Sequence, residues 1–203
     1  AQVIAKKITG QIGGNLSIES SVDTSNYASD QKNAGFNASI SAKDPSFSAN
    51  ASKQEINHGY QSTNKQSGLY AGEDGFDINV AGNTNLKGGV IASQAEPDKN
   101  RLSTQSLSFE DIDNHLDIDA KSQQASLSLG GGNAQLPLMQ SGTLENSHKK
   151  STTQSAIAEG QIEVRDDQQT GTNSLAGLSR DTDNASGAIT DTFNLAEIQE
   201  KQQ

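Results

Sequence analysis

Short runs in which apolar and polar residues alternate recur along this chain, and they constrain its fold more than any other feature. A period of two places successive side chains on opposite faces of a β-strand, whereas disordered polar tracts do not alternate. Glycine, asparagine or aspartate usually ends each run, and these residues favour turns. We therefore expect strands at residues 15–19, 36–41, 76–81, 111–120, 125–129 and 161–165.

The composition limits what such strands can build. Only 31% of the 203 residues are hydrophobic and 4% are aromatic, which is too little for an ordinary globule of this length. Three interpretations remain: a disordered chain, a thin repetitive β structure with a narrow core, or a piece of something longer. The alternation favours β structure over disorder. Because Ala1-Gln2-Val3-Ile4 carries neither an initiator methionine nor a signal peptide, we also expect a fragment of a larger precursor.

The charge and the rare residues exclude several classes of function. A net charge of -10 argues against a nucleic-acid partner, which would favour a basic surface. No apolar run is long enough for a membrane-spanning helix. Without cysteine there is no disulfide and no cysteine-based zinc or redox centre, and only His58, His115 and His148 remain as nitrogen ligands for a metal.

The spacing of apolar residues indicates a repeat. The step from Ile18 to Ile40 is similar to the steps from Leu86 to Leu107 and from Leu107 to Leu127. These steps correspond to a period of about 20–22 residues, which lies in the range of known repeat architectures. Such a period with short strands and turns predicts an all-β solenoid, a parallel β-helix with one coil per repeat.

This pattern predicts two regions. We expect residues 1–165 to form the β-helix, with an irregular coil or loop near 41–66 and 133–156, where alternation is weak. We expect disorder in 142–155 and in parts of 167–188. Residues 166–203 are interpreted as a linker followed by a short helix.

The helix prediction depends on a capping pattern. Asn194 and Glu197 stand at capping-box spacing, and Ile189, Phe193 and Ala196 share one helical face. The pattern predicts a helix over residues 195–203.

An acidic row is the most site-like pattern in the chain. Asp111, Asp113, Asp117 and Asp119 alternate with apolar residues, and His115 lies among them. Such a row is able to bind a cation such as calcium or to supply paired carboxylates for glycoside cleavage. The alternative is a solvated strand face whose charges keep a β structure soluble. We favour the solvated face, since the calcium-binding glycine-rich nonapeptide is missing, and we assign no catalytic, cofactor-binding or metal-binding residue.

Other polar and glycine positions fit turns. Asn15 and Asn83 each follow a glycine and precede a strand, so they form either an internal ladder or exposed turns, and we favour turns. Gly88-Gly89 and Gly130–Gly132 lack the spacing of a phosphate-binding loop, so we expect turns there as well.

Three segments carry a family resemblance. Residues 67–93, which read SGLYAGEDGFDINVAGNTNLKGGVIAS, resemble the haemagglutinin repeat of filamentous haemagglutinins and contact-dependent growth inhibition toxins of Gram-negative bacteria. Residues 107–114 resemble the segment that follows this repeat. Residues 178–185 resemble the junction between the distal repeats and the pretoxin region.

The resemblance implies a right-handed parallel β-helix exported through an outer-membrane two-partner secretion transporter. It also implies a chain that is held in the periplasm until target contact, and then displayed at the cell surface or secreted. The expected function is structural and non-enzymatic: delivery of a downstream toxin domain of the same chain across the target-cell outer membrane, by way of that membrane or its receptor. The alternatives are the stalk of a filamentous adhesin and a β-helix carbohydrate-active enzyme. No cofactor is expected.

Overall fold

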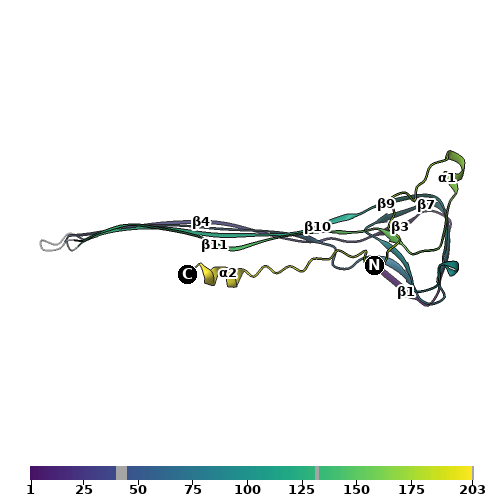
Figure 1. Ribbon diagram of the computed structural model, residues 1–203, viewed down its shortest axis with the longest axis horizontal. Coiled ribbons are helices and arrows are strands. Elements are labelled where there is room, and N and C mark those ends of the chain that lie inside the picture. The colour runs from purple at the N-terminus through teal and green to yellow at the C-terminus, as the bar shows by residue number, and fades with distance from the viewer. Residues whose placement is uncertain (40–44, 131–132, 203) are drawn as a thin grey trace. The chain divides into compact units, whose positions relative to one another are not determined.

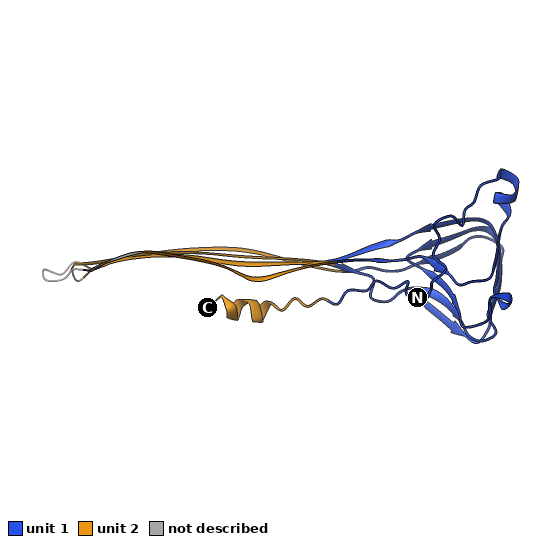
Figure 2. Ribbon diagram, viewed as in Figure 1, with its two compact units in different colours: residues 1–23, 61–115, 150–190 blue, residues 24–60, 116–149, 191–203 orange. Residues whose placement is uncertain are grey.

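The computed structural model describes residues 1–39, 45–130 and 133–202, so the predictions for Ile40 and Gly131-Gly132 lie outside the described residues. The chain divides into two compact units (Figure 2). Unit 1 comprises residues 1–23, 61–115 and 150–190, and unit 2 comprises residues 24–60, 116–149 and 191–203. Each unit is therefore assembled from three separate stretches of the chain.

Unit 1 contains two parallel sheets (Figure 1). The first has the order β1-β6-β8-β12, formed by Gln2–Ala5, Gly68–Ala71, Val90–Ser93 and Ala156–Ile157. The second has the order β13-β9-β7-β2, formed by Gln161–Val164, Arg101–Glu110, Phe76–Lys87 and Ile8–Ile12, and β3 (Leu16–Glu19) also pairs with β7. The predicted all-β class with parallel pairing is confirmed.

The register of the parallel strands differs in detail from the predicted spacing. Leu86 pairs with Ile18 on one side and with Phe109 on the other, and Leu107 pairs with Thr84. In β6 and β8, Gly68 pairs with Val90, so the sequence distance between these paired residues matches the predicted period of about 20–22 residues. The observed steps are close to the predicted period of about 20–22 residues, but Leu86 and Leu107 are not paired; a slip of two residues keeps the same face of a strand, so residue type alone does not detect it.

The core of unit 1 lies between these sheets. Ile78, Leu86, Ile91, Leu102 and Ile157 are almost completely buried. Ile78 and Leu86 have polar and more exposed neighbours along their strand, as period-two alternation requires, whereas Ile91 and Ile157 stand next to the buried Val90 and Ala156. Burying each such side chain contributes about 1.5–3 kcal/mol, so a small set of apolar residues suffices for a thin stack of strands.

Four long strands form a third sheet with the order β11-β10-β5-β4, and most of their length lies in unit 2. They are β4 (Asp23–Ser39), β5 (Ser46–Ser62), β10 (Ile112–Gly130) and β11 (Asn133–Thr153). Strand β5 begins at Ser46 beside Gly130, the end of β10, so these two neighbours run in opposite directions.

This sheet corrects the predictions for two regions. Residues 46–62 and 133–153 form strands where we expected an irregular coil or loop, and residues 142–153 are strand rather than disordered. Many side chains of these strands are exposed on both faces. Backbone hydrogen bonds between strands therefore hold these segments, and such pairing leaves no alternating pattern in the sequence.

The described part of the chain also contains three short helical elements. They are η1 (Pro97–Lys99), α1 (Arg165–Thr170) and α2 (Leu195–Lys201). The predicted N-cap of α2 is confirmed, since the Asn194 side chain accepts a hydrogen bond from the Glu197 backbone N–H at 3.3 Å. Helix α1 was not predicted. Within the described ranges, no helix has the length and apolar character that crossing a membrane requires.

Candidate functional site

The acidic row lies where the alternation predicted it, along one side of β10. Leu116, Ile118 and Ala120 are fully buried on one side of the strand, whereas Asp117 and Asp119 are only partly buried on the other. Asp113 and His115 precede them in unit 1, and Asp117 and Asp119 belong to unit 2. The carboxylates therefore line the solvent side of a strand.

His148 on β11 contacts the two carboxylates of unit 2, a partner that the sequence did not reveal. Its Nδ1 lies 2.8 Å from Asp117 Oδ1 and its Nε2 lies 3.6 Å from Asp119 Oδ1. The hydrogen bond with Asp117 raises the pKa of His148, and the charge of Asp119 acts in the same direction. The arrangement is a cross-strand hydrogen-bonded contact on a half-exposed surface, and it is an ion pair when His148 is protonated.

The remaining members of the row do not join a common centre. Asp111 accepts a hydrogen bond from the Ser155 backbone N–H at 2.9 Å and thereby links two strand ends. Among the residues that the structure describes, no group of three or more histidine, aspartate or glutamate side chains is placed to hold a metal ion.

Asn114 is a buried polar residue that we did not single out from the sequence. It lies on the inner side of β10 and is 1% exposed. Its Oδ1 accepts from the Thr63 backbone N–H at 2.8 Å, and its Nδ2 donates to Thr153 Oγ1 at 2.9 Å and to the Gly187 carbonyl at 3.1 Å. One side chain therefore joins four separate segments of unit 1. The sequence did carry a signal for this residue, because Asn114 stands at a position where the alternation from Ile112 to Leu116 would place an apolar side chain.

The turn that we favoured at Asn83 is wrong, because Asn83 lies within β7, where it pairs with Asn15. Asn15 Oδ1 accepts from the Asn83 backbone N–H at 2.8 Å, and Asn83 Oδ1 accepts from Ser106 Oγ at 2.8 Å. Asn15 is exposed. The turn predicted at Gly88 is confirmed by its positive φ of 55°, where an added Cβ would lie 2.6 Å from Ile112.

The junction segment, residues 178–185, packs against the end of the first parallel sheet. Ser179 pairs with Ala156 of β12, and Ala185 is fully buried against Val90 and Ala156. Arg180 donates from Nε to the Ile157 carbonyl and from Nη2 to the Ala158 carbonyl, both at 2.9 Å. This segment covers carbonyl groups that the last strand would otherwise present to solvent.

A second C-terminal contact lies in unit 2, where residues 191–201, the C-terminal strap, pack on the long-stranded sheet. His58 Nε2 lies 3.0 Å from Asp191 Oδ1, and the His58 ring stacks on Phe193 with centroids 4.0 Å apart. Tyr27 also contacts the Phe193 ring, and Ile198 of α2 is 1% exposed. His58 is therefore a packing residue in this structure.

Comparisons with known proteins find one family model and several long relatives that resemble this chain. Residues 1–34 match the family model described as "Hemagglutinin repeat". "Toxin CdiA" of Escherichia coli is 36% identical over 217 residues, which cover 100% of this chain and 7% of that protein. "tRNA nuclease CdiA" of Yersinia mollaretii is 39% identical over 209 residues, which cover 99% of this chain and 7% of that protein.

A further relative is the "Deoxyribonuclease CdiA" of Yersinia pseudotuberculosis, 36% identical over 209 residues that cover 99% of this chain and 19% of that protein. No solved structure matches the chain. The chain thus spans only 7% of the length of the first two relatives and is similar to them along nearly all of its own length. Along nearly its whole length the chain is similar to a segment of CdiA toxins, and residues 1–34 match the haemagglutinin repeat.

Proposed function

We propose that this chain is a structural and delivery segment of a secreted contact-dependent growth inhibition toxin. It assists the transfer of a C-terminal toxin domain across the outer membrane of the target cell and has no enzymatic role of its own. The observation that carries the proposal is the similarity to CdiA toxins along the whole chain, including the junction segment. The nuclease activities in the names of these relatives are those of far longer proteins.

We propose that the two parallel sheets of unit 1 are faces of a right-handed β-helix. The support is the register, in which β6 pairs with β8 and β7 pairs with β9 at steps close to the predicted period, as the pairs Gly68–Val90 and Leu86–Phe109 show. Steps between the other parallel pairs are longer because a long hairpin intervenes, formed by β4 and β5 or by β10 and β11. The hairpins are insertions between coils in this interpretation.

The domain boundary that we propose separates a repeat region, residues 1–165, from a linker and the start of a pretoxin-like region, residues 166–203. Arg180 and Ala185 support this, since they pack against the last strands instead of adding a strand of full length. A segment of this kind ends one fold and lets a different one follow.

The proposed partners are an outer-membrane two-partner secretion transporter, the target-cell outer membrane or its receptor, and the toxin domain of the same precursor. The chain is secreted or displayed at the bacterial surface, and is held in the periplasm until contact. The absence of cysteine suits a chain that crosses a pore unfolded, and strands that pair with neighbouring coils allow folding to propagate.

Growth competition tests the proposal when display and target binding are measured separately. In the full precursor, we would delete the residues that correspond to 1–203 and quantify surface display, target-cell binding and growth inhibition. Delivery predicts that inhibition is lost while target binding persists. If target binding is lost and the toxin, introduced directly into target cells, remains active, the segment is an adhesin stalk instead.

A further inference from the structure

The C-terminal strap is attached to the long-stranded sheet by side chains. The Phe193 ring stacks on His58, and Lys201 Nζ lies 3.7 Å from Glu145 Oε2. Ile198 is the buried residue of α2. Among the described residues, no backbone–backbone hydrogen bond joins the strap to this sheet. The strap therefore lacks the backbone pairing that holds the strands to one another.

The junction segment, which precedes the strap in the chain, is attached differently. The Ile157 N–H donates to the Ser179 carbonyl at 3.1 Å, and the Gln154 N–H donates to the Ala185 carbonyl at 2.8 Å. Ala185 is also fully buried. Two successive parts of the C-terminal region thus differ in kind, because the junction segment shares backbone hydrogen bonds with strand ends and the strap does not.

The contact between the strap and the sheet leaves polar atoms and space over. His58 Nε2 lies 3.0 Å from Asp191 Oδ1, but His58 Nδ1 is buried without a partner in the described structure. Gln202, which adjoins the strap, has its Nε2 buried and unpartnered as well. A hollow of about 230 Å³ lies between Gln199 of α2 and Ile56 of the sheet. A buried polar atom without a partner costs free energy, which water restores once the strap leaves.

Helix α2 is too short to be stable away from the sheet. It has seven residues, and isolated helices shorter than about 12–15 residues are marginal in water. Its ion pair between Lys201 and Glu197, at 3.1 Å, spans one exposed turn and adds little. Helix formation and docking are therefore coupled, which makes the strap a two-state element.

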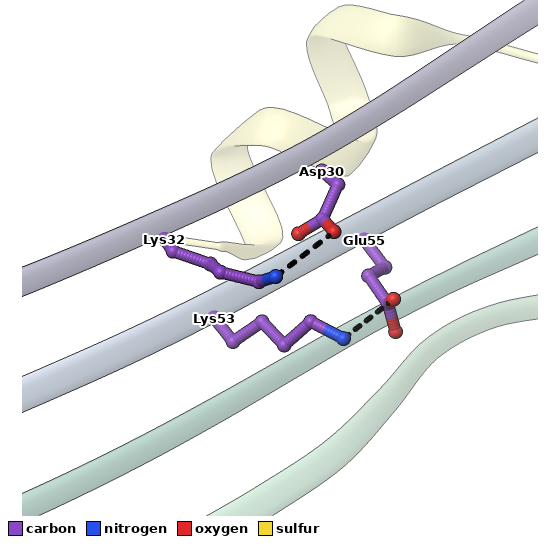
Figure 3. A network of polar contacts seen from close by, with 4 residues as sticks. All are labelled: Asp30, Lys32, Lys53 and Glu55. Carbon is purple, nitrogen blue, oxygen red and sulfur yellow. Dashed lines mark hydrogen bonds and ion pairs between the residues drawn. The ribbon is translucent and has the colours of Figure 1, made fainter.

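The sheet has polar contacts of its own that do not involve the strap (Figure 3). Lys53 Nζ lies 2.6 Å from Glu55, and Lys32 Nζ lies 3.5 Å from Asp30. Lys53 and Glu55 flank Gln54, whose side chain reaches towards the strap. Because side chains alternate between the faces of a strand, the Lys53–Glu55 pair lies on the opposite face. Departure of the strap leaves these contacts of the sheet intact.

We propose that the C-terminal strap is a releasable latch, which undocks from the long-stranded sheet as one piece while the junction segment stays attached. In the docked state, the strap covers the side of the sheet that carries Ile56 and His58. In the released state, this side is open to solvent, His58 Nδ1 gains water as a partner, and α2 unfolds. The inference concerns this chain alone and does not depend on the proposed function.

Release of the strap lengthens the chain. A residue rises about 1.5 Å in a helix and spans about 3.4 Å when extended, so unfolding of the seven residues of α2 adds about 13 Å. A pull on the C-terminal end favours the longer state. The strap therefore yields to tension before the junction segment does.

Native-state hydrogen exchange of the chain of residues 1–203 tests the latch without any substitution. The amides of Phe193 and Ile198 should exchange at least about 100-fold faster than those of Gln154 and Ile157, and more slowly than in an unstructured peptide. Their rates should depend weakly on urea, since local opening exposes little surface. Equal rates with the same urea dependence in both groups would show one cooperative unit and overturn the proposal, as would strap amides that exchange as in a free peptide.

Substitutions in α2 test whether the whole strap opens together. Ile198→Ala removes the buried contact and keeps a good helix former, so it should speed exchange at the Phe193 amide at least about tenfold. Glu200→Ala, at an exposed position of the same helix, should change that rate less than about twofold. Because Phe193 lies outside α2, its amide reports undocking and not helix fraying. An unchanged Phe193 rate in Ile198→Ala would overturn the proposal.

A tether gives the converse measurement, because the chain has no cysteine of its own. Glu145→Cys combined with Lys201→Cys lets a short bis-maleimide join the sheet to α2 where the two native side chains meet. The control is the same double variant with each thiol capped by N-ethylmaleimide. The tether should slow exchange at the Phe193 amide at least about tenfold relative to the control. Equal rates would show that the strap opens in separate parts, and would refute its release as one piece.

Discussion

Replacing Asn114 by alanine should destabilise unit 1 strongly for a single polar substitution. The change removes the acceptor of the buried Thr63 N–H and the donor to Thr153 Oγ1 and the Gly187 carbonyl. A buried group left without a partner costs about 1–3 kcal/mol, and the orphaned Thr63 amide is one such group. The smaller alanine side chain also leaves a space in a fully buried position. We expect a loss of about 3 kcal/mol in the free energy of unfolding.

Chemical denaturation of residues 1–203 measures this loss, with hydrogen exchange at the Thr63 amide as a local probe. Asn114→Asp keeps the acceptor of the Thr63 N–H and loses the amide donors, so it should protect that amide better than Asn114→Ala. The matched control is Asn37→Ala, an exposed asparagine on β4, which should change stability by less than about 0.5 kcal/mol. A similarly small effect of Asn114→Ala would refute the reasoning.

Three further predictions concern separate contacts. The pKa of His148 is raised by its contact with Asp117. The stability that this contact contributes is therefore present below pH ~6.5, the ordinary pKa of histidine, and is lost as the pH rises through the raised pKa. NMR titration of His148 should show the raised pKa, and Asp117→Asn should lower it. Arg180→Met should lower the denaturation midpoint and expose the β12 end to hydrogen exchange, because the carbonyls of Ile157 and Ala158 lose their donor; unchanged exchange would contradict it. Phe193→Ala should loosen the C-terminal strap and speed its proteolytic removal, since the aromatic stack on His58 is lost; equal cleavage rates would contradict it.

Local patterns predicted much of the secondary structure. The alternation at Phe76, Ile78 and Val80 reports burial of one strand face, and these three residues are nearly or fully buried. The capping of α2 by Asn194 depends on residues three positions apart. Such features depend on neighbours in the sequence, so the sequence displays them.

The pairing of strands depends on partners that are distant in the sequence and could not be predicted in this way. Leu86 pairs with Phe109 and not with Leu107. The sequence does not distinguish these two pairings, because a shift of two residues keeps the same side chains on the same face of the strand. The His148–Asp117 contact and the four segments that meet at Asn114 join residues far apart in sequence. The exposed faces of β4 and β11 carry no pattern that burial would impose.

Growth inhibition by a point variant of the full precursor tests the central claim most directly, that the parallel stack itself is needed for delivery. Leu86→Asp places a charge at a fully buried position of β7, and Asn85→Asp places the same charge on the adjacent, less buried position. With equal amounts of toxin made by the two strains, we predict that Leu86→Asp inhibits target growth far less than Asn85→Asp. Equal inhibition by both variants would contradict the account.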